Sequence, residues 1–273
     1  MTATLADAGR VLMIGCGNMG GAMLGRWLDA GLDPARVTVI SPSGRVMPGG
    51  IAVATAVPEP DEAFEIIVLA LKPQKLGELR NTPFAAHAPR LLVSILAGVE
   101  EAAIAATCRA GSVVRAMPNL PVALGKGVTG LFSSNADEGA RDVAEALCRP
   151  LGHHEWIADE RLFDTVTALA GSGPAFLFRF IDALARAGAA LGLPEDQARR
   201  LALTTVEGSA LMAAAADDSP GLLADRVASP GGSTREGLNV LDDDDALVQL
   251  LTDTLHASER RNGELAALAA LAR

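Results

Sequence analysis

The residues best suited to chemistry lie in two glycine-rich stretches, one near each end of the chain. The first reads IGCGNMG over residues 14–20, and its three glycines have G-x-G-x-x-G spacing. The second reads SPGGST over residues 229–234. The chain has four histidines, and none of them lies in either stretch. Backbone N–H groups and hydroxyls, which bind anions, are therefore the main chemical resource of both stretches.

The first stretch is placed to bind a dinucleotide. It follows an apolar run at residues 11–15 and opens a helical pattern at residues 20–30. In this context Gly15 permits a tight turn, Gly17 lets a pyrophosphate approach the backbone, and Gly20 lets the helix pack on the strand. The alternative is a glycine turn that serves packing alone. We predict cofactor contacts from Ile14, Gly15, Cys16, Gly17, Asn18, Met19 and Gly20.

The end of the second predicted strand bears on which dinucleotide binds. An enzyme that uses NAD normally has Asp or Glu there to hold the ribose hydroxyls. This chain has two neutral donors, Ser41 and Ser43, followed by the cation Arg45. This set favours the 2′-phosphate of NADPH, with NADH as the alternative cofactor. For Arg45 the alternative is an ordinary surface arginine.

Two further strand ends are expected to flank the ribose and the nicotinamide. They read LALKPQ at residues 69–74 and SILAGV at residues 94–99. In an open parallel sheet the ligand lies outside the carboxyl ends of the strands. Lys72 is equally well explained as a solvated loop charge. The predicted contacts are Ala70, Leu71, Lys72, Pro73, Ile95, Leu96 and Ala97.

The second stretch offers a concave site for a carboxylate. Its glycines expose backbone N–H groups, and its hydroxyls flank the start of a predicted helix. The alternative is a simple capped turn, because Ser and Thr are favoured at helix N-termini. The candidate substrate-binding residues are Ser229, Gly231, Gly232, Ser233 and Thr234.

The elements that must position these stretches divide the chain in two. Short apolar runs at residues 11–15, 37–40, 51–53, 66–71, 91–96 and 113–117 alternate with helical patterns. They predict buried parallel strands and an α/β fold with a Rossmann-like, doubly wound parallel sheet. After a further strand at residues 128–132, helical periodicity prevails. We place a dinucleotide-binding domain at residues 1–156 and an all-helical dimerisation and substrate domain at residues 157–273.

The helical half contains the longest apolar stretch of the chain, residues 174–193. Arg179, Asp182 and Arg186 interrupt it, so it predicts a buried helix and not a membrane span. The surrounding helices are rich in Ala and Gly and carry more apolar surface than one small domain can hide. We therefore expect a homo-oligomer, at least a dimer, that buries these helices against a second copy.

Composition excludes several other classes. The net charge of −10 without a basic stripe argues against nucleic-acid binding. Three widely spaced cysteines without a CxxC pair predict no disulfide framework and no zinc site, and so a reducing cytoplasm. No signal peptide is evident. Adjacent His153 and His154 would point to opposite faces of a strand, and the acidic run at residues 242–245 lacks calcium-loop spacing. We therefore predict no metal site.

The order of the motifs resembles the pyrroline-5-carboxylate reductase family. IGCGNMGGAM, LALKPQ, VRAMPN, ALAGSGPAF and SPGGST occur in the family's order over almost the whole chain. The segment at residues 225–242 looks most like the family's signature. The resemblance implies a Rossmann domain, a helical dimerisation domain, a nicotinamide cofactor and the last step of proline biosynthesis.

The resemblance also implies roles for single residues. Backbone amides near Ser233 and Thr234 would hold the substrate carboxylate, and the Thr234 hydroxyl, as the catalytic group, would hydrogen-bond the ring nitrogen. Glu160 falls where the family has an acidic residue near the substrate. The chain departs from the family's usual residues at Leu120, Ala170 and Phe176.

The expected reaction is hydride transfer from NAD(P)H to the C=N carbon of 1-pyrroline-5-carboxylate, which gives L-proline. An iminium carries its own activating charge, so no strong acid is needed. Two alternatives are a reductase of another cyclic imine and a non-catalytic NADPH-binding relative. A hydroxy-acid dehydrogenase is disfavoured, because such an enzyme needs a Lys or His acid–base and residues 157–273 contain only His256.

Overall fold

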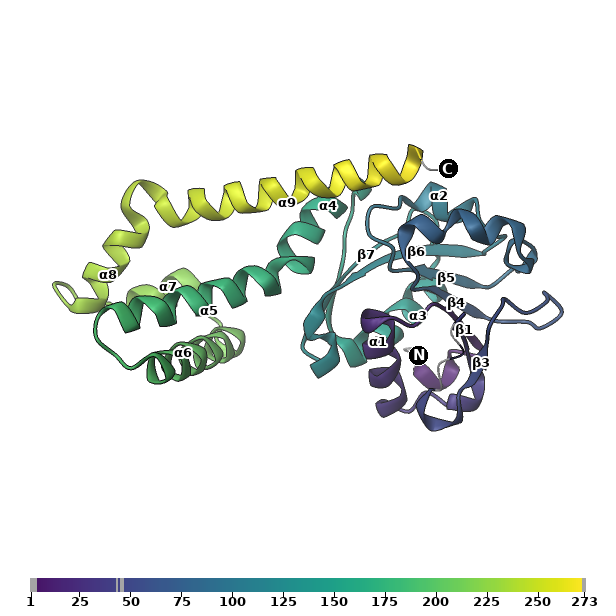
Figure 1. The fold of residues 1–273 in the computed structure, drawn as a ribbon, viewed down its shortest axis with the longest axis horizontal. Helices are drawn as coiled ribbons and strands as arrows, with labels where there is room; N and C mark the ends of the chain where they lie inside the picture. The colour runs from purple at the N-terminus through teal and green to yellow at the C-terminus, as the bar shows by residue number, and fades with distance from the viewer. Residues whose placement is uncertain (1–3, 43, 45–46, 272–273) are drawn as a thin grey trace. The chain divides into compact units, whose positions relative to one another are not determined.

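The computed structural model of the chain describes residues 4–42, 44 and 47–271, and its ribbon is drawn in Figure 1. The chain forms two compact units. The first comprises the chain up to Ser172 together with the C-terminal stretch from Ser258, and the second comprises Gly173–Ala257. The predicted fold class, an α/β domain followed by a helical domain, is confirmed.

The first unit is built on one eight-stranded sheet with the order β3-β2-β1-β4-β5-β6-β7-β8. Neighbouring strands from β3 to β6 in this order pair in parallel. The reversal of strand order beside β1 is typical of dinucleotide-binding sheets. The strands are β1 (Val11–Ile14), β2 (Val37–Ile40), β3 (Ala52–Ala54), β4 (Ile66–Leu69), β5 (Leu91–Ser94), β6 (Ser112–Pro118), β7 (Gly127–Phe132) and β8 (Gly152–Trp156).

Both faces of this sheet are buried, and successive side chains alternate between two cores. Met13 of β1 packs in one core with residues of α1 (Asn18–Asp29) and α3 (Glu138–Cys148). Leu12 packs in the other core with α2 (Glu101–Ala105) and with the 3-10 turns between β4 and β5. Helices and turns on both faces confirm the doubly wound arrangement (Figure 1).

The far edge of the sheet differs from the sequence prediction. β7 pairs antiparallel with β6, and β8 adds a strand where we expected none. The connection from β6 to β7 is a single 3-10 turn, Leu120–Leu124, which is too short for the crossover that parallel strands require. β8 reads GHHEW, so Trp156 is its only apolar side chain, and the strand is half-exposed; hydrophobic periodicity therefore does not reveal it.

Residues 160–171, in the half of the chain where helical periodicity prevails, form three short helical pieces and not one continuous helix. A 3-10 turn (Glu160–Leu162) leads into α4 (Phe163–Val166) and then into a π-helical turn (Thr167–Gly171). The amide of Asn119 donates to the carbonyl of Ala170 at 3.0 Å and so takes a carbonyl that an α-helix would use. Such π-helical turns are frequent at functional sites.

The second unit is all helical. α5 packs against α6, where the small residues Ala185, Ala198 and Ala202 are buried and allow close approach. α9 continues past Ala257 into the stretch that belongs to the first unit. The helices are α5 (Gly173–Ala190), α6 (Glu195–Ala215), α7 (Pro220–Arg226), α8 (Ser233–Asp242) and α9 (Ala246–Leu271).

The prediction that residues 174–193 form a buried helix is wrong for the single chain. Of the described residues of α5, Ala185 alone is buried, whereas Leu177, Phe178 and Phe180 are 46%, 58% and 47% exposed. By length and composition, the helical run Glu160–Ala190 could cross a membrane, a test that core helices of soluble proteins also pass. Apolar exposure on this scale is typical of interaction surfaces.

The packing of α1 on α3 can be tested at Trp27. Its side chain is 1% exposed, and its indole N–H donates to the carbonyl of Leu147 at 2.6 Å. Replacement Trp27→Phe leaves a cavity and an unpaired carbonyl, so the free energy of unfolding should fall by about 2–3 kcal/mol. Urea unfolding followed by circular dichroism measures this loss.

Trp156→Phe is the matched control. The Trp156 indole donates to Glu145 at 3.0 Å at a half-buried position, so its loss should cost less than about 1 kcal/mol. Equal losses in the two variants would contradict a packing role specific to Trp27.

Candidate functional site

The glycine loop between β1 and α1 is shaped by a close approach of two strand ends. Gly15 has φ +88°, and a Cβ built there would lie 2.6 Å from the carbonyl oxygen of Ala70. Its N–H donates to Ile40 at 3.1 Å, which ties the loop to the end of β2. The loop therefore has no room for a side chain at this position, whatever it binds.

The N-terminus of α1 is open to a ligand. The N-cap residue is Gly17, which has no side chain to cap the helix, and a Cβ built at Gly17 would meet nothing within 4 Å. A Cβ at Gly20 would instead lie 2.8 Å from the Met13 Cε atom, so Gly20 is needed for helix–strand packing. Uncapped N–H groups beside empty space suit a pyrophosphate, and the three glycines have the geometry expected of a dinucleotide loop.

A cavity of about 720 Å³ lies on one side of this loop, at the carboxyl ends of β1, β2 and β4. Seven residues predicted to bind the cofactor line it: Ile14, Gly15, Cys16, Gly17, Ala70, Leu71 and Lys72. The sequence did not indicate its outer wall, because those residues, apart from Ile40 at the end of β2, lie in coil and 3-10 turns without periodicity. They are Ile40, Pro42, Thr55, Ala56, Val57, Lys75, Glu78, Leu79, Asn81, Thr82 and Pro83.

A second cavity, of about 340 Å³, lies on the other side of the loop. Its lining joins the α1 N-terminus to the ends of β4, β5 and β6, and it includes the predicted Asn18, Met19, Gly20 and Ile95. Met117 and Pro118 complete it and were not predicted as cofactor contacts. Their position at the end of a strand, in the VRAMPN motif, was the available signal.

The remaining predicted cofactor residues have other surroundings. Leu96 is 3% exposed in the core behind the sheet, and Ala97 and Pro73 line neither cavity. Ser41 lies between Ile40 and Pro42, which both line the larger cavity. Ser43 and Arg45 lie outside the described residues, so the structure gives no position for them.

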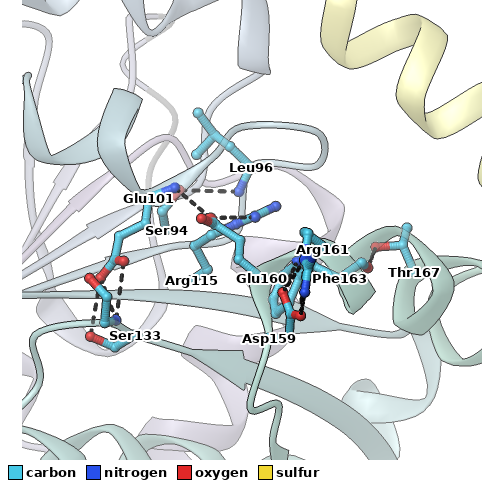
Figure 2. A network of polar contacts seen from close by, with 11 residues as sticks. Ser94, Leu96, Glu101, Arg115, Ser133, Asp159, Glu160, Arg161, Phe163 and Thr167 are labelled. Carbon is cyan, nitrogen blue, oxygen red and sulfur yellow. Dashed lines mark hydrogen bonds and ion pairs between the residues drawn. The ribbon is translucent and has the colours of Figure 1, made fainter.

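Glu160, predicted to contact substrate, lies in a polar network within the first unit (Figure 2). Its Oε1 atom accepts from Arg115 Nη1 at 2.6 Å and from the backbone N–H of Glu101 at 2.7 Å. Arg115 is 4% exposed, and its Cζ atom lies 4.2 Å from the centre of the Phe163 ring. The Arg115 Nε atom has no hydrogen-bond partner in the described structure. Arg115 is therefore a buried cation that forms an ion pair with Glu160.

A small cavity of about 220 Å³ adjoins this pair and is lined by Gly98, Glu100, Arg115, Glu160, Arg161, Phe163 and Asp164. Burial raises the pKa of the Asp164 carboxyl, and Arg115 opposes this shift. On the surface nearby, hydrogen bonds from Arg161 lower the pKa of Asp159 to about 2. Sequence reasoning missed Arg115, because an arginine inside a strand gives no periodic signal.

The SPGGST loop belongs to the second unit, between α7 and α8. The N–H of Gly232 donates to Ser229 at 2.9 Å and closes the turn. Gly232 is the N-cap of α8 and makes no side-chain cap hydrogen bond, while Ser233 and Thr234 are exposed in the first turn. The hydroxyls therefore do not cap the helix, which weighs against the capped-turn alternative. Arg235 is held by Asp225 at 2.7 Å.

Two of the three cysteines, Cys108 and Cys148, are buried free thiols. Burial raises the pKa of Cys148 to about 12 and that of Cys108 to about 11, so both are unreactive thiols at neutral pH. Within the described residues, no group of three or more His, Cys, Asp or Glu side chains is arranged to hold a metal ion.

Comparison with protein families assigns both halves of the chain. Residues 160–265 match the family model for pyrroline-5-carboxylate reductase dimerisation. Residues 10–98 match a model described as NADP oxidoreductase, coenzyme F420-dependent. An NADP-binding domain followed by a dimerisation domain is the organisation that the fold displays.

Individual relatives agree over nearly the full length. A pyrroline-5-carboxylate reductase of Pseudomonas aeruginosa is 34% identical over 94% of this chain and 97% of its own. The structure of such a reductase from Coxiella burnetii is 31% identical, with a TM-score of 0.83 over 94% of this chain and 98% of that chain. A Plasmodium falciparum pyrroline carboxylate reductase with NADP bound, 24% identical, shares the fold with a TM-score of 0.77 over 94% and 98%. The chain belongs to the pyrroline-5-carboxylate reductase family.

Proposed function

We propose that this chain reduces 1-pyrroline-5-carboxylate to L-proline, the last step of proline biosynthesis, with NADPH as its preferred reductant. The observation that carries the proposal is the loop at residues 229–234, whose glycine N-cap leaves the first turn of α8 uncapped and exposed. That loop suits a carboxylate, and it occurs in a chain whose other half has a dinucleotide-binding sheet. The 34% identical relatives are named for this activity.

The substrate is held, in this proposal, by the SPGGST loop. Backbone N–H groups at Ser233 and Thr234 bind the carboxylate, favoured by the positive end of the α8 dipole. Ser229, Gly231 and Gly232 shape the turn. The Thr234 hydroxyl is the catalytic group and hydrogen-bonds the ring nitrogen, which orients the C=N bond. A protonated imine is already electrophilic, so orientation and charge are the protein's contribution.

The residues around the β1–α1 loop fit a nicotinamide dinucleotide. The uncapped N-terminus of α1 and the open space at Gly17 suit its pyrophosphate, and the two flanking cavities suit its two nucleoside halves. When bound, the reduced nicotinamide supplies the hydride. We place the nicotinamide in the cavity that includes Met19, Ile95 and Pro118, whose apolar side chains suit a flat ring.

The preference for NADPH rests on the end of β2. Ser41 stands there in place of the carboxylate that would repel a 2′-phosphate, and Ser43 and Arg45 follow in the sequence. Lys72 and Lys75 add positive charge to the 720 Å³ cavity at this strand end. NADH remains the alternative reductant.

We further infer that the chain works as a homo-oligomer, at least a dimer, in a reducing cytoplasm. The match to a dimerisation family and the exposed apolar side chains of α5 support the first inference. Cys108 and Cys148 as buried thiols, not joined in a disulfide, support the second.

The proposed reaction is tested by following the loss of NADPH absorbance at about 340 nm with purified chain and 1-pyrroline-5-carboxylate. We expect turnover to proline, with kcat/KM for NADPH at least about tenfold above that for NADH. Binding of NADPH without turnover would overturn the proposed reaction. Equal use of both cofactors would overturn only the preference.

The role of the loop is tested by Thr234→Ala. Removing the hydroxyl should lower kcat/KM for the imine about 100-fold and change the NADPH dissociation constant less than about twofold. Thr234→Ser, which keeps the hydroxyl, should retain most of the activity. Parallel losses of imine reduction and NADPH binding in Thr234→Ala would show that the loop is only structural.

The oligomeric state is tested by light scattering on the eluting protein. We expect a mass at least twice the 28.0 kDa of one chain. Because the exposed side chains are apolar, the assembly should persist at high salt. A monomeric mass at assay concentration would contradict a dimer.

A further inference from the structure

We propose that Glu160 is a positioning residue: its carboxylate, fixed by Arg115, fastens together the two walls of the cavity assigned to the nicotinamide. The inference rests on the proposed function for the identity of that cavity. It differs from the role that the family resemblance implies for Glu160, which is direct contact with the substrate.

The first wall is the loop that follows β5. Ile95 from this loop lines the 340 Å³ cavity. At the loop's start, the buried hydroxyl of Ser94 accepts from the N–H of Leu96 at 3.4 Å. At its end, the N–H of Glu101 donates to Glu160 at 2.7 Å. Two side chains thus hold the loop, one at each end.

The hydrogen bond from the Glu101 N–H to Glu160 caps the N-terminus of α2. Glu100 occupies the N-cap position and makes no side-chain cap hydrogen bond. Glu160, 59 residues further along the chain, supplies the acceptor, and its negative charge favours the helix N-terminus. The Glu101 carboxylate, 7% exposed, accepts from the N–H of Ser134 at 2.9 Å. The first residue of α2 is therefore fixed through both its backbone and its side chain (Figure 2).

The second wall is β6. Arg115 lies on this strand, paired in register with Ser94 of β5, and donates to Glu160 at 2.6 Å. Met117 and Pro118, at the end of the same strand, line the 340 Å³ cavity opposite the α1 N-terminus. One carboxylate oxygen therefore receives a donor from each wall and links the loop after β5 to β6.

Arg115, which binds Glu160, is itself fixed by Phe163. The Arg115 guanidinium lies over the Phe163 ring, with Cζ 4.2 Å from the ring centre, and Phe163 is 2% exposed. The planar guanidinium suits this stacked position, which an ammonium group would not reproduce. Loss of the Glu160 acceptor would release the start of α2 and leave the buried Arg115 Nη1 donor without its 2.6 Å partner.

The test compares Glu160→Ala with Glu160→Gln, using NADPH binding and steady-state kinetics. Glu160→Ala should raise the NADPH dissociation constant about tenfold and lower kcat by up to about 100-fold, because a misplaced nicotinamide reacts slowly. The KM for the imine should change less than about threefold. Glu160→Gln keeps an oxygen acceptor for both donors, so NADPH affinity should return to within about threefold of the unaltered chain.

The opposite pattern would overturn the proposal. If the carboxylate acts by charge on the substrate, Glu160→Gln will be as defective as Glu160→Ala, the imine KM will rise and NADPH affinity will be unchanged. Glu62→Ala is the control. It breaks the surface ion pair of Glu62 with Arg10 at 3.1 Å and should change neither the NADPH dissociation constant nor the KM for the imine.

Two further measurements keep the test decisive. If thermal unfolding shows that Glu160→Ala does not fold, Arg115→Lys loosens the same pair and must raise the NADPH dissociation constant at least about threefold; no change overturns the proposal. NADPH binding requires no imine. A chain that binds NADPH without reducing the imine would refute the proposed reaction, and the affinities of the variants would still decide the role of Glu160.

Discussion

The close approach of Gly15 to the Ala70 carbonyl is the contact on which the rest of the cofactor half depends. A Cβ at Gly15 would lie 2.6 Å from that oxygen, so only glycine fits here. The ends of β1 and β4 can therefore lie side by side. α1 then begins with Gly17 as its N-cap, and a cavity opens on each side of the loop. Because both faces of the sheet are buried, the register of β1 and β4 is fixed, and with it the position of Gly15 beside Ala70.

The polar network around Glu160 connects the strand ends in the other half of the sheet, at β5 and β6. Parallel strands end at one edge, but their loops need fastening if they are to hold a flat ring at a fixed distance. Here a single buried arginine and a carboxylate from a distant segment provide that fastening. A buried ion pair adds little net stability, because desolvation offsets most of the attraction, but it specifies one arrangement of the groups it joins.

The second unit has the opposite character. Its helices pack through alanines, and large apolar side chains such as Phe178 and Leu184 remain exposed on α5. A helix that is apolar on several faces is not covered by one neighbour, which is why we propose that a second copy covers this surface. Membership of a family with a dimerisation domain accounts for this surface without a membrane.

The sequence by itself determined the alternating strands and helices, the glycine spacing that turns β1 into α1, and the family, because these depend on periodicity and on residues close together in the chain. Only the tertiary structure revealed the reversed strand β7, the added strand β8 and the π-helical turn. β7 and β8 are defined by their pairing with neighbouring strands, and in the π-helical turn the amide of Asn119, 51 residues away, binds the Ala170 carbonyl. It also brought Arg115, Glu101 and Glu160 together from positions up to 59 residues apart. No pattern along the chain encodes such a meeting, because the sheet register and the path of the loops create it.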